Sequence, residues 1–325
     1  MGNDATYSLE DFGIPYECVL GRSDFNIPIE LIPKQYIQGA IYVNKKLRCT
    51  IEYGRKVNRG GYGSIYRCKR SGKEMCVKAP HNSAYSLCPE AILQWVACQT
   101  LEEAGIAGAI PHIYDIFQYA GETRFSMDFI HGMNAIDAIN AGDSGMILQI
   151  LAQVAILLGY LEEHIHLDHR DLKADNLWIR QTPIEYFVTV GGLKWRLSAP
   201  FQVVILDFGF ACIGGEDGKA IISLSDGIVP KIDPCPKEGR DLFQLIASIW
   251  SIDKIRSTVS DPVRIQIEEL LSYNRASYID IIRHTPNPYW IYLAVSDPEF
   301  RYPPLHPVAL LLKLSQGGAA GLYHE

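Results

Sequence analysis

The spacing of apolar residues changes once along the chain, close to His131-Gly132. Before this point, short runs of strand-forming residues at 51–57, 64–70 and 74–78 are separated by glycine-containing turns, which predicts an antiparallel meander. After it, apolar residues recur at steps of three and four, as in residues 147–161, which is the period of a helix with a buried face. A sheet followed by a mainly helical part predicts an α+β protein.

The other periodic segments fit this division. Further strands are expected at 113–119, 123–130 and 203–206, and further helices at 90–103 and 242–252.

These segments define three parts of the chain. Residues 1–48 carry prolines between short apolar patches and show no sustained period, so we expect an N-terminal extension packed on a domain. Residues 49–130 form the sheet-rich part with one helix, and residues 131–325 form the mainly helical part.

The composition excludes several classes of protein. With 325 residues, of which 48% are hydrophobic, the chain is long enough to bury a large core. Its 30 basic and 37 acidic side chains leave a formal net charge of −7, so no overall positive field favours contact with nucleic acid or an anionic membrane. We therefore expect no nucleic-acid partner.

The cysteines and the N-terminus bear on the compartment. The cysteines, at positions 18, 49, 68, 76, 88, 98, 212 and 235, include no CxxC pair, and we interpret them as reduced thiols of a cytoplasmic protein. The most apolar window, residues 147–161, is shorter than the ~20 residues that span a bilayer, so no transmembrane helix is expected. Gly2 and Thr6 match a loose N-myristoylation pattern, but no polybasic second signal follows, so a lipid anchor is not favoured.

A glycine-rich turn, Asn58-Arg59-Gly60-Gly61-Tyr62-Gly63, joins the first two strands of the meander. Glycine lets backbone N–H groups approach a polyphosphate closely, although most glycines in hairpins are purely structural. In the strand 74–78 a period of two places Cys76 and Lys78 on one face, which we expect to look into a cleft beneath the turn. Lys78 is therefore a candidate phosphate ligand, whereas a lone strand lysine is usually solvated.

Two later motifs complete the chemistry that phosphoryl transfer needs. Residues 169–176 read His-Arg-Asp-Leu-Lys-Ala-Asp-Asn, and residues 207–209 read Asp-Phe-Gly. Transfer from ATP requires a carboxylate that accepts the proton of the attacking hydroxyl, oxygen ligands for Mg²⁺, and cations that hold the phosphates. The ordered set of glycine turn, Val77-Lys78, HRDLKxxN and DFG resembles the protein kinase family over roughly residues 51–325.

The resemblance implies a two-lobed kinase-like fold. A small antiparallel sheet with one helix would form one lobe and a larger, mainly helical lobe the other, with ATP and Mg²⁺ in the cleft. Lys78 would bind the α and β phosphates and pair with Glu90 of the helix 90–103. Asp171 would be the catalytic base, and Lys173 would contact the γ phosphate.

The same resemblance implies the ligands of Mg²⁺ and of the nucleotide. Asn176 and Asp207 would bind the metal, Met127 would be the gatekeeper, and Asp241 would hold the catalytic loop. The residues implied for nucleotide binding are Val57, Asn58, Gly60, Gly61, Gly63, Ile65, Cys76, Lys78, Glu90, Asp128 and Ile130.

The chain also departs from the family pattern. Asn58 stands where the family has its first loop glycine, although asparagine tolerates positive φ better than most residues. Residues 181–200 lengthen the hairpin between Asn176 and Asp207, either as a docking surface or simply as a longer hairpin. No Ala-Pro-Glu follows residues 207–209, and residues 227–231 read Gly-Ile-Val-Pro-Lys instead. This departure is similar to that of divergent kinases such as the haspin group and some kinases of large DNA viruses, and a viral source is one interpretation.

The lysine in HRDLKxxN is typical of serine/threonine kinases, so the resemblance implies a protein substrate with a Ser or Thr acceptor. Two alternatives remain open. The missing Ala-Pro-Glu also suits a small-molecule kinase on the same fold, and an ATP-binding pseudokinase scaffold would lack turnover. The histidines at 164, 166 and 169, with Asp168, suggest a zinc cluster, but their spacing lacks a second ligand pair.

Overall fold

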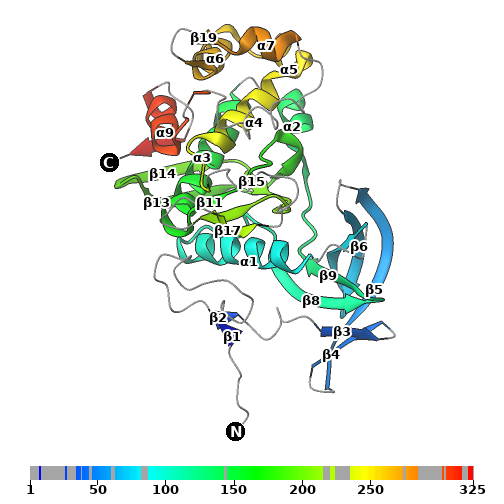
Figure 1. Ribbon diagram of the computed structural model, residues 1–325. Coiled ribbons are helices and arrows are strands. Elements are labelled where there is room, and N and C mark those ends of the chain that lie inside the picture. Colours follow the sequence, from blue (N-terminus) through cyan, green and yellow to red (C-terminus); the bar gives the residue numbers. More distant parts are fainter. Residues whose placement is uncertain are drawn as a thin grey trace.

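The computed structural model describes residues 7–8, 26–27, 34–37, 39–43, 46–59, 63–81, 87–142, 145–214, 220–223, 235–273, 276–284, 302–303, 305–316 and 321–324. They form a mixed α+β structure in which a barrel of strands lies beside a body of helices and short sheets (Figure 1). This confirms the α+β class expected from the change in apolar spacing.

The barrel carries the sheet-rich half of the chain. Its strands, in spatial order, are β3 (Lys34–Ile37), β4 (Ala40–Val43), β5 (Lys46–Arg59), β6 (Gly63–Arg70), β7 (Lys73–Pro80), β9 (Glu122–Met127) and β8 (Ile113–Tyr119). Neighbours are antiparallel except at the closing pair, where β3 runs parallel to β8. The predicted meander and the strand at 113–119 are confirmed, while the strand predicted at 123–130 ends at Met127.

The segment 1–48 contributes more than an extension. Strands β3 and β4 belong to the barrel, and β1 (Tyr7–Ser8) pairs with β2 (Asn26–Ile27) in a separate two-stranded sheet. The predicted boundary at residue 48 therefore falls within β5 rather than at the edge of the sheet. Four-residue strands give too short an alternation to be recognised, and their pairing is a tertiary event.

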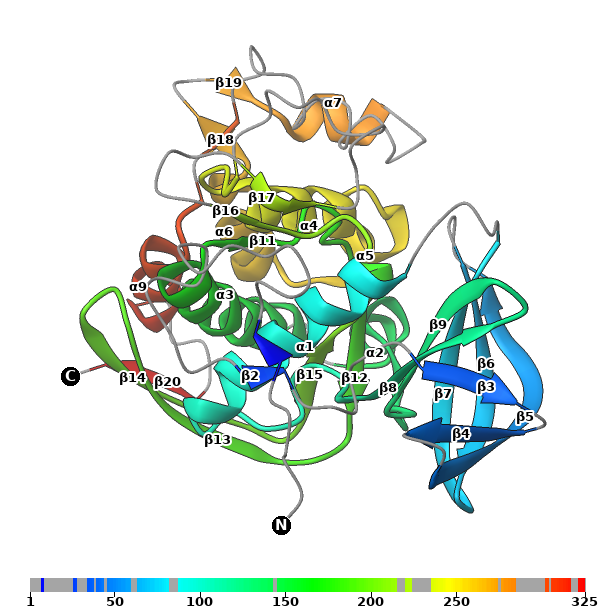
Figure 2. The same ribbon diagram turned by 60° about the horizontal axis from the view of Figure 1, so that its bottom comes forward.

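Helix α1 (Cys88–Glu103) contacts both the barrel strands β8 and β9 and the long helix α3 (Met146–Ile165), as Figure 2 shows. A proline lies in its first turn, where the missing N–H would have no helical partner. Because it is packed from two directions, every residue from 90 to 101 except Gln99 is buried.

Helix α3 is the centre of the helical body. Among the described residues it is the one helix long and apolar enough to cross a membrane by length and composition, but 72% of its most apolar window is buried inside the protein. The helix has 20 residues and is longer than the predicted window of 147–161, so its burial rather than its length indicates that its apolar side chains belong to the core.

The other elements of the body are α2 (Ala135–Ala141), α4 (Arg240–Trp250), α5 (Asp253–Thr258), α6 (Asp261–Leu270), α7 (Ile279–His284), α9 (Pro307–Gln316) and the 3₁₀ turn η4 (Ala174–Asn176), with the short strand pair β18 (Ser272–Tyr273) and β19 (Ala276–Ser277). Three small sheets accompany them: β10 (Met133–Asn134), β12 (Leu177–Arg180) and β15 (Gln202–Ile205); β11 (Leu167–Asp168), β16 (Cys212–Gly214) and β17 (Ala220–Ser223); and β13 (Ile184–Val190), β14 (Leu193–Ala199) and β20 (Leu322–His324). The strand and helix predicted at 203–206 and 242–252 are confirmed as β15 and α4, and segment 181–200 is a hairpin whose second strand pairs with β20.

The expectation that all cysteines are reduced is wrong for one pair. Cys212 and Cys235 form a disulfide, whereas cysteines 49, 68, 76, 88 and 98 are free thiols. The two bonded residues are 23 positions apart, and the fold brings their Cα atoms to 6.5 Å. The absence of a CxxC motif carries no information about such a distant pair.

A buried carboxylate links three barrel strands. Asp115 on β8 is fully buried and accepts hydrogen bonds from Arg70 Nε of β6 at 2.6 Å and from Ser126 Oγ of β9 at 3.3 Å. The Arg70 side chain is 24% exposed, so its charge is only partly solvated. Removing the carboxylate would leave a guanidinium without this partner in the sheet.

We expect Asp115→Ala to lower the free energy of unfolding by about 2–3 kcal/mol, less than the ~3–5 kcal/mol lost when a fully buried ion pair is broken, because Arg70 is 24% exposed. The matched control is Glu185→Ala, which breaks the exposed Glu185–Arg196 pair and should change it by less than about 1 kcal/mol. Urea denaturation of both variants measures these changes. Equal losses of unfolding free energy in the two variants would contradict a stabilising role for the Asp115–Arg70 pair.

Candidate functional site

Lys78 lies between two carboxylates from distant parts of the chain. Its Nζ contacts Glu90 Oε1 on α1 and donates to Asp207 Oδ1 at 2.7 Å. The side chains of Lys78 and Glu90 are 8% and 2% exposed, whereas that of Asp207 is 41% exposed. The predicted contact between Lys78 and Glu90 is therefore confirmed. Because the side chain of Asp207 is partly exposed, the group of three residues is accessible from the side of Asp207.

The charges of the three groups depend on each other. Burial lowers the pKa of Lys78, but the opposite charges of Asp207 and Glu90 outweigh it, so the pKa is raised. Burial raises the pKa of Glu90 to about 7 against the attraction of Lys78. Burial also acts to raise the pKa of Asp207, yet the neighbouring Lys78 holds it below its ordinary value. The site thus keeps a cation and an ionised carboxylate side by side.

These groups line a cavity of about 500 Å³, within the size range of small-ligand sites. The residues implied for nucleotide or metal binding that line it are Val57, Asn58, Gly63, Ile65, Cys76, Lys78, Glu90, Asp128, Ile130, Asn176 and Asp207. Met127 lines it as well, and Cys76 and Lys78 share the predicted face. Gly60 and Gly61 lie outside the described residues. Arg55, Gln94 and Trp178 also line the cavity, and no motif had marked them.

Gly63 allows β6 to pass directly over Lys78. A Cβ atom at this position would lie 2.9 Å from the carbonyl oxygen of Ala79 and 3.4 Å from Cε of Lys78. A side chain here would therefore push β6 away from the lysine stem. This glycine is required for close packing at the roof of the cavity.

Asp128 holds the wall of the cavity that residues 127–130 form. The N–H of Asp128 donates to the carbonyl of His112 at 3.1 Å. The carboxylate of Asp128 accepts from the N–H of His112 at 3.0 Å and from the hydroxyl of Tyr114 at 2.5 Å. These bonds anchor the point where the chain leaves β9.

Asp171 and Lys173 lie beside the cavity and connect to it through Asn176. The amide nitrogen of Asn176 donates to the carbonyl oxygen of Asp171 at 2.8 Å and to its Oδ2 at 2.9 Å. Nζ of Lys173 lies 3.1 Å from both carboxylate oxygens of Asp171. Because the nitrogen of Asn176 makes both bonds, its amide oxygen is not used in them.

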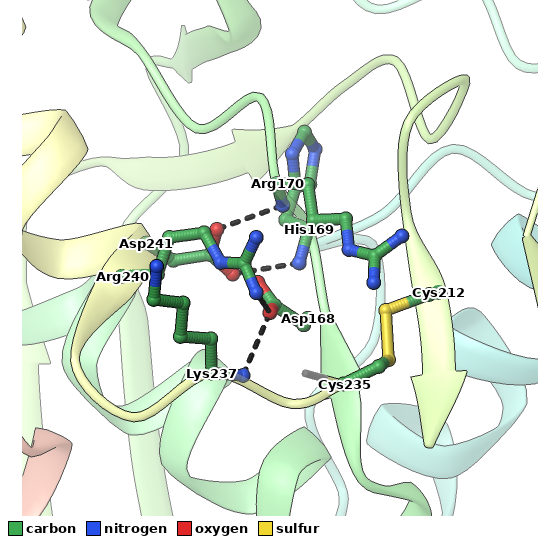
Figure 3. Close-up of a disulfide and its surroundings, with 8 residues drawn as sticks. All are labelled: Asp168, His169, Arg170, Cys212, Cys235, Lys237, Arg240 and Asp241. Carbon is green, nitrogen blue, oxygen red and sulfur yellow. Dashed lines mark hydrogen bonds and ion pairs between the residues drawn. A yellow bond between two sulfur atoms is a disulfide. The ribbon is translucent and has the colours of Figure 1, made fainter. Parts of the chain in front are cut away.

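Asp241 holds the segment that precedes Asp171. Its carboxylate accepts hydrogen bonds from the backbone N–H groups of His169 and Arg170 at 2.7 and 2.8 Å (Figure 3). Burial, together with the nearby charge of Asp168, raises the pKa of Asp241 well above its ordinary value. This confirms the contact expected of Asp241 in the sequence.

A second carboxylate in the same cluster was missed by motif reasoning. Asp168 accepts from the N–H of Lys237 at 2.9 Å and pairs with Arg240 at 3.0 Å, with both side chains almost fully buried. Its position directly before the HRD triplet was the available signal. Figure 3 shows the disulfide between Cys212 and Cys235 beside this cluster.

The zinc cluster considered at residues 164–169 has a simpler explanation. His164 Nδ1 bonds the carbonyl of Tyr160 at 2.9 Å, and His169 Nε2 donates to the carbonyl of Leu206 at 3.0 Å. Within the described ranges, one trio places metal-binding atoms within 4.8 Å of one another: Cys98, Glu102 and His112. The thiol of Cys98 donates to the carboxylate of Glu102 and to the carbonyl of Ile110, which accounts for the proximity of Cys98 and Glu102.

A pH-dependent stability follows from Glu162 on α3. Burial raises its pKa to about 7, with Asp168, Glu238 and Glu163 adding repulsion and His306 opposing it. The folded chain therefore keeps a proton that the unfolded chain has already lost, and stability falls as the pH rises from about 4.5 to about 7. Glu162→Gln cannot ionise, so its free energy of unfolding relative to wild type should rise by about 1–2 kcal/mol between about pH 5 and pH 8.

Urea denaturation at both pH values measures this difference. A difference that does not change with pH would show that Glu162 ionises normally in the folded chain.

Comparisons with known proteins assign no relative. No model of a known protein family matches the chain, and no curated protein matches it. The functional interpretation therefore depends on the motifs and on the geometry that they adopt.

Proposed function

We propose that this protein is an ATP-dependent serine/threonine protein kinase with a two-lobed kinase-like fold. The observation that supports this most strongly is the meeting of Lys78, Glu90 and Asp207 on one wall of a nucleotide-sized cavity that Asn176 also lines. In this proposal the barrel and α1 form the small lobe, and the helical body forms the large lobe. ATP lies in the cavity between them.

The adenine would lie against Ile65, Cys76 and Met127, which line the cavity. Since the N–H of Asp128 already donates to His112, the free edge of the base would be recognised by the carbonyl of Asp128 and by the backbone of Ile130. The ammonium group of Lys78 would contact the α and β phosphates. Glu90 keeps that group in position from α1.

The donor set around Asn176 and Asp207 fits Mg²⁺. An amide oxygen and a carboxylate are hard oxygen ligands, and both residues line the cavity. The 41% exposure of Asp207 leaves it accessible from the cavity while Lys78 occupies one oxygen. Bound Mg²⁺ would neutralise charge on the phosphates.

Asp171 would orient the hydroxyl group of a serine or threonine. Asn176 and Lys173 fix its carboxylate, which removes the need to reorganise it during the reaction. The substrate oxygen forms a bond to the γ phosphorus of ATP, the bond to ADP breaks, and the hydroxyl proton passes to Asp171. Lys173 then balances the negative charge on the transferred group.

The choice of substrate depends on residues that lie outside the described part, including 227–231. Generic protein substrates and small hydroxyl compounds therefore need to be compared in the same assay. Phosphate incorporation only into small compounds would favour the small-molecule kinase, and ATP binding without any turnover would favour the pseudokinase scaffold.

We expect Asp171→Asn to lower the phosphorylation rate by about 10²-fold or more, because the amide cannot accept the proton. Nucleotide affinity should change little, since Asp171 does not line the cavity. A radiolabelled-ATP assay and equilibrium nucleotide binding measure the two effects. Equal rates for variant and wild type would remove Asp171 from the mechanism.

Lys78→Met should behave differently, because it removes a cation that contacts the nucleotide before and during transfer. We expect nucleotide affinity to fall by about tenfold or more and the rate to fall with it. Lys69→Met on the exposed side of β6 is the matched control and should change neither. Thermal unfolding shows whether the Lys78 variant is folded, and a folded variant with wild-type affinity would contradict the assigned phosphate contact.

A further inference from the structure

The disulfide between Cys212 and Cys235 joins two segments that both contact the loop carrying Asp171. Cys212 lies on β16, a few residues after the Asp-Phe-Gly motif, and is the register partner of Asp168 on β11. Both bonded cysteines are fully buried. The first segment therefore adjoins the catalytic loop through a strand pair.

The second segment adjoins the same loop through side chains. Two residues after Cys235, the N–H of Lys237 donates to Asp168, and Arg240 pairs with the same carboxylate. Asp241 then binds the N–H groups of His169 and Arg170 (Figure 3). The disulfide thus connects β16 to the start of α4, from which the loop is held.

The two segments also approach each other closely through their backbones. A Cβ atom on Gly214 would lie 1.8 Å from the carbonyl oxygen of Cys235, and the N–H of Gly214 donates to the carbonyl of His166 at 3.0 Å. The segments around Gly214 and Cys235 are therefore held together by backbone packing as well as by the disulfide. Glycine at 214 permits it.

We propose that the Cys212–Cys235 disulfide is a redox-controlled lock on residues 168–171, a regulatory role that rests on the proposed kinase function. With the bond formed, β16 pairs with Asp168, and Arg240 and Asp241 at the start of α4 bind Asp168 and the backbone of residues 169–170. These contacts keep Asp171 in position. Reduction breaks the covalent link between the two segments, so that residues 168–171 open more often.

The chemistry is thiol–disulfide exchange with a dithiol reductant. A thiolate of the reductant attacks one sulfur, the protein S–S bond breaks, and the released cysteine thiolate takes a proton. The second thiol of the reductant resolves the mixed disulfide and releases the other cysteine as a thiol, so the reductant leaves as a disulfide. Glutathione disulfide reverses the reaction. Because both sulfurs are buried, exchange requires local opening.

The other described thiols are poor competitors for this chemistry. Burial raises the pKa of Cys76 to about 12 and that of Cys88 to about 11, and it also raises the pKa values of cysteines 49, 68 and 98. Thiols with raised pKa values form little thiolate and react slowly. Among the described cysteines, the response is therefore expected at the bonded pair.

Amide hydrogen exchange tests the lock without any measurement of activity. The full chain is compared with and without dithiothreitol, and mass spectrometry confirms the state of the bond. We expect the amides of His169 and Arg170 to exchange about tenfold faster after reduction, while those of α3 stay unchanged. Unchanged exchange at 169–170 in a verified reduced protein would overturn the proposal.

Turnover provides the second measurement. Reduction should lower kcat by about fivefold and leave nucleotide affinity within about twofold, because neither Cys212 nor Cys235 lines the cavity. The double variant Cys212→Ala/Cys235→Ala should have the reduced-state rate and no response to dithiothreitol, whereas Cys88→Ala should respond like wild type. A double variant that still responds would overturn the lock, as would loss of the fold on reduction, which marks a structural bond only.

The two measurements separate the proposals. If residues 169–170 respond to reduction but no form of the protein transfers phosphate, the lock stands and the kinase function fails. If turnover is present but neither exchange nor kcat responds, the function stands and the lock is overturned.

Discussion

The site depends on one shared cation. Lys78 is almost fully buried, and an ammonium group in that setting stays charged only because Glu90 and Asp207 offset its loss of hydration. The three residues come from β7, from α1 and from the segment after β15. Moving any one of these elements would separate a buried charge from an ionic partner. The barrel, α1 and residues 207–209 are therefore energetically coupled through a single side chain.

The buried carboxylate of Asp241 holds the segment that precedes Asp171. Hydrogen bonds through His169 and Leu206 connect this segment to Asp207 and Asn176. Asp241 holds the N–H of His169, and the ring of His169 donates to the carbonyl of Leu206, next to Asp207. The N–H of Leu206 in turn donates to the carbonyl of Asn176 at 2.8 Å. Leu206 thus lies between the residues proposed to bind metal. This main-chain hydrogen bond continues the pairing of β12 with β15 and sets the relative position of Asn176 and Asp207.

Periodicity, turn glycines and motif order in the sequence predicted the helices, strands and site contacts that depend on short stretches of chain. The helical period predicted α3 and α4, and alternation with turn glycines predicted β5, β6 and β7. The order of the motifs predicted that Lys78, Glu90 and Asp207 lie together. The strands β3 and β4 were not found, because each is short and gains its stability from neighbours in the barrel. The disulfide and the contacts of Asp168 were also not found. Both join residues that are far apart in sequence, and neither side of such a pair carries a periodic signal.

Two residues of the candidate site adopt a backbone conformation that is uncommon outside glycine. Arg170 and Asp207 have φ values of 61° and 62°, in the left-handed region that is uncommon for residues other than glycine, although aspartate enters it more readily than arginine. Such residues cost about 1–3 kcal/mol each and persist only where the surroundings determine them fully. Here Asp241 binds the N–H of Arg170, and Lys78 binds the carboxylate of Asp207. Asp207 lines the cavity and Arg170 directly precedes Asp171, so the bonds that hold these two backbone conformations also hold residues of the candidate site.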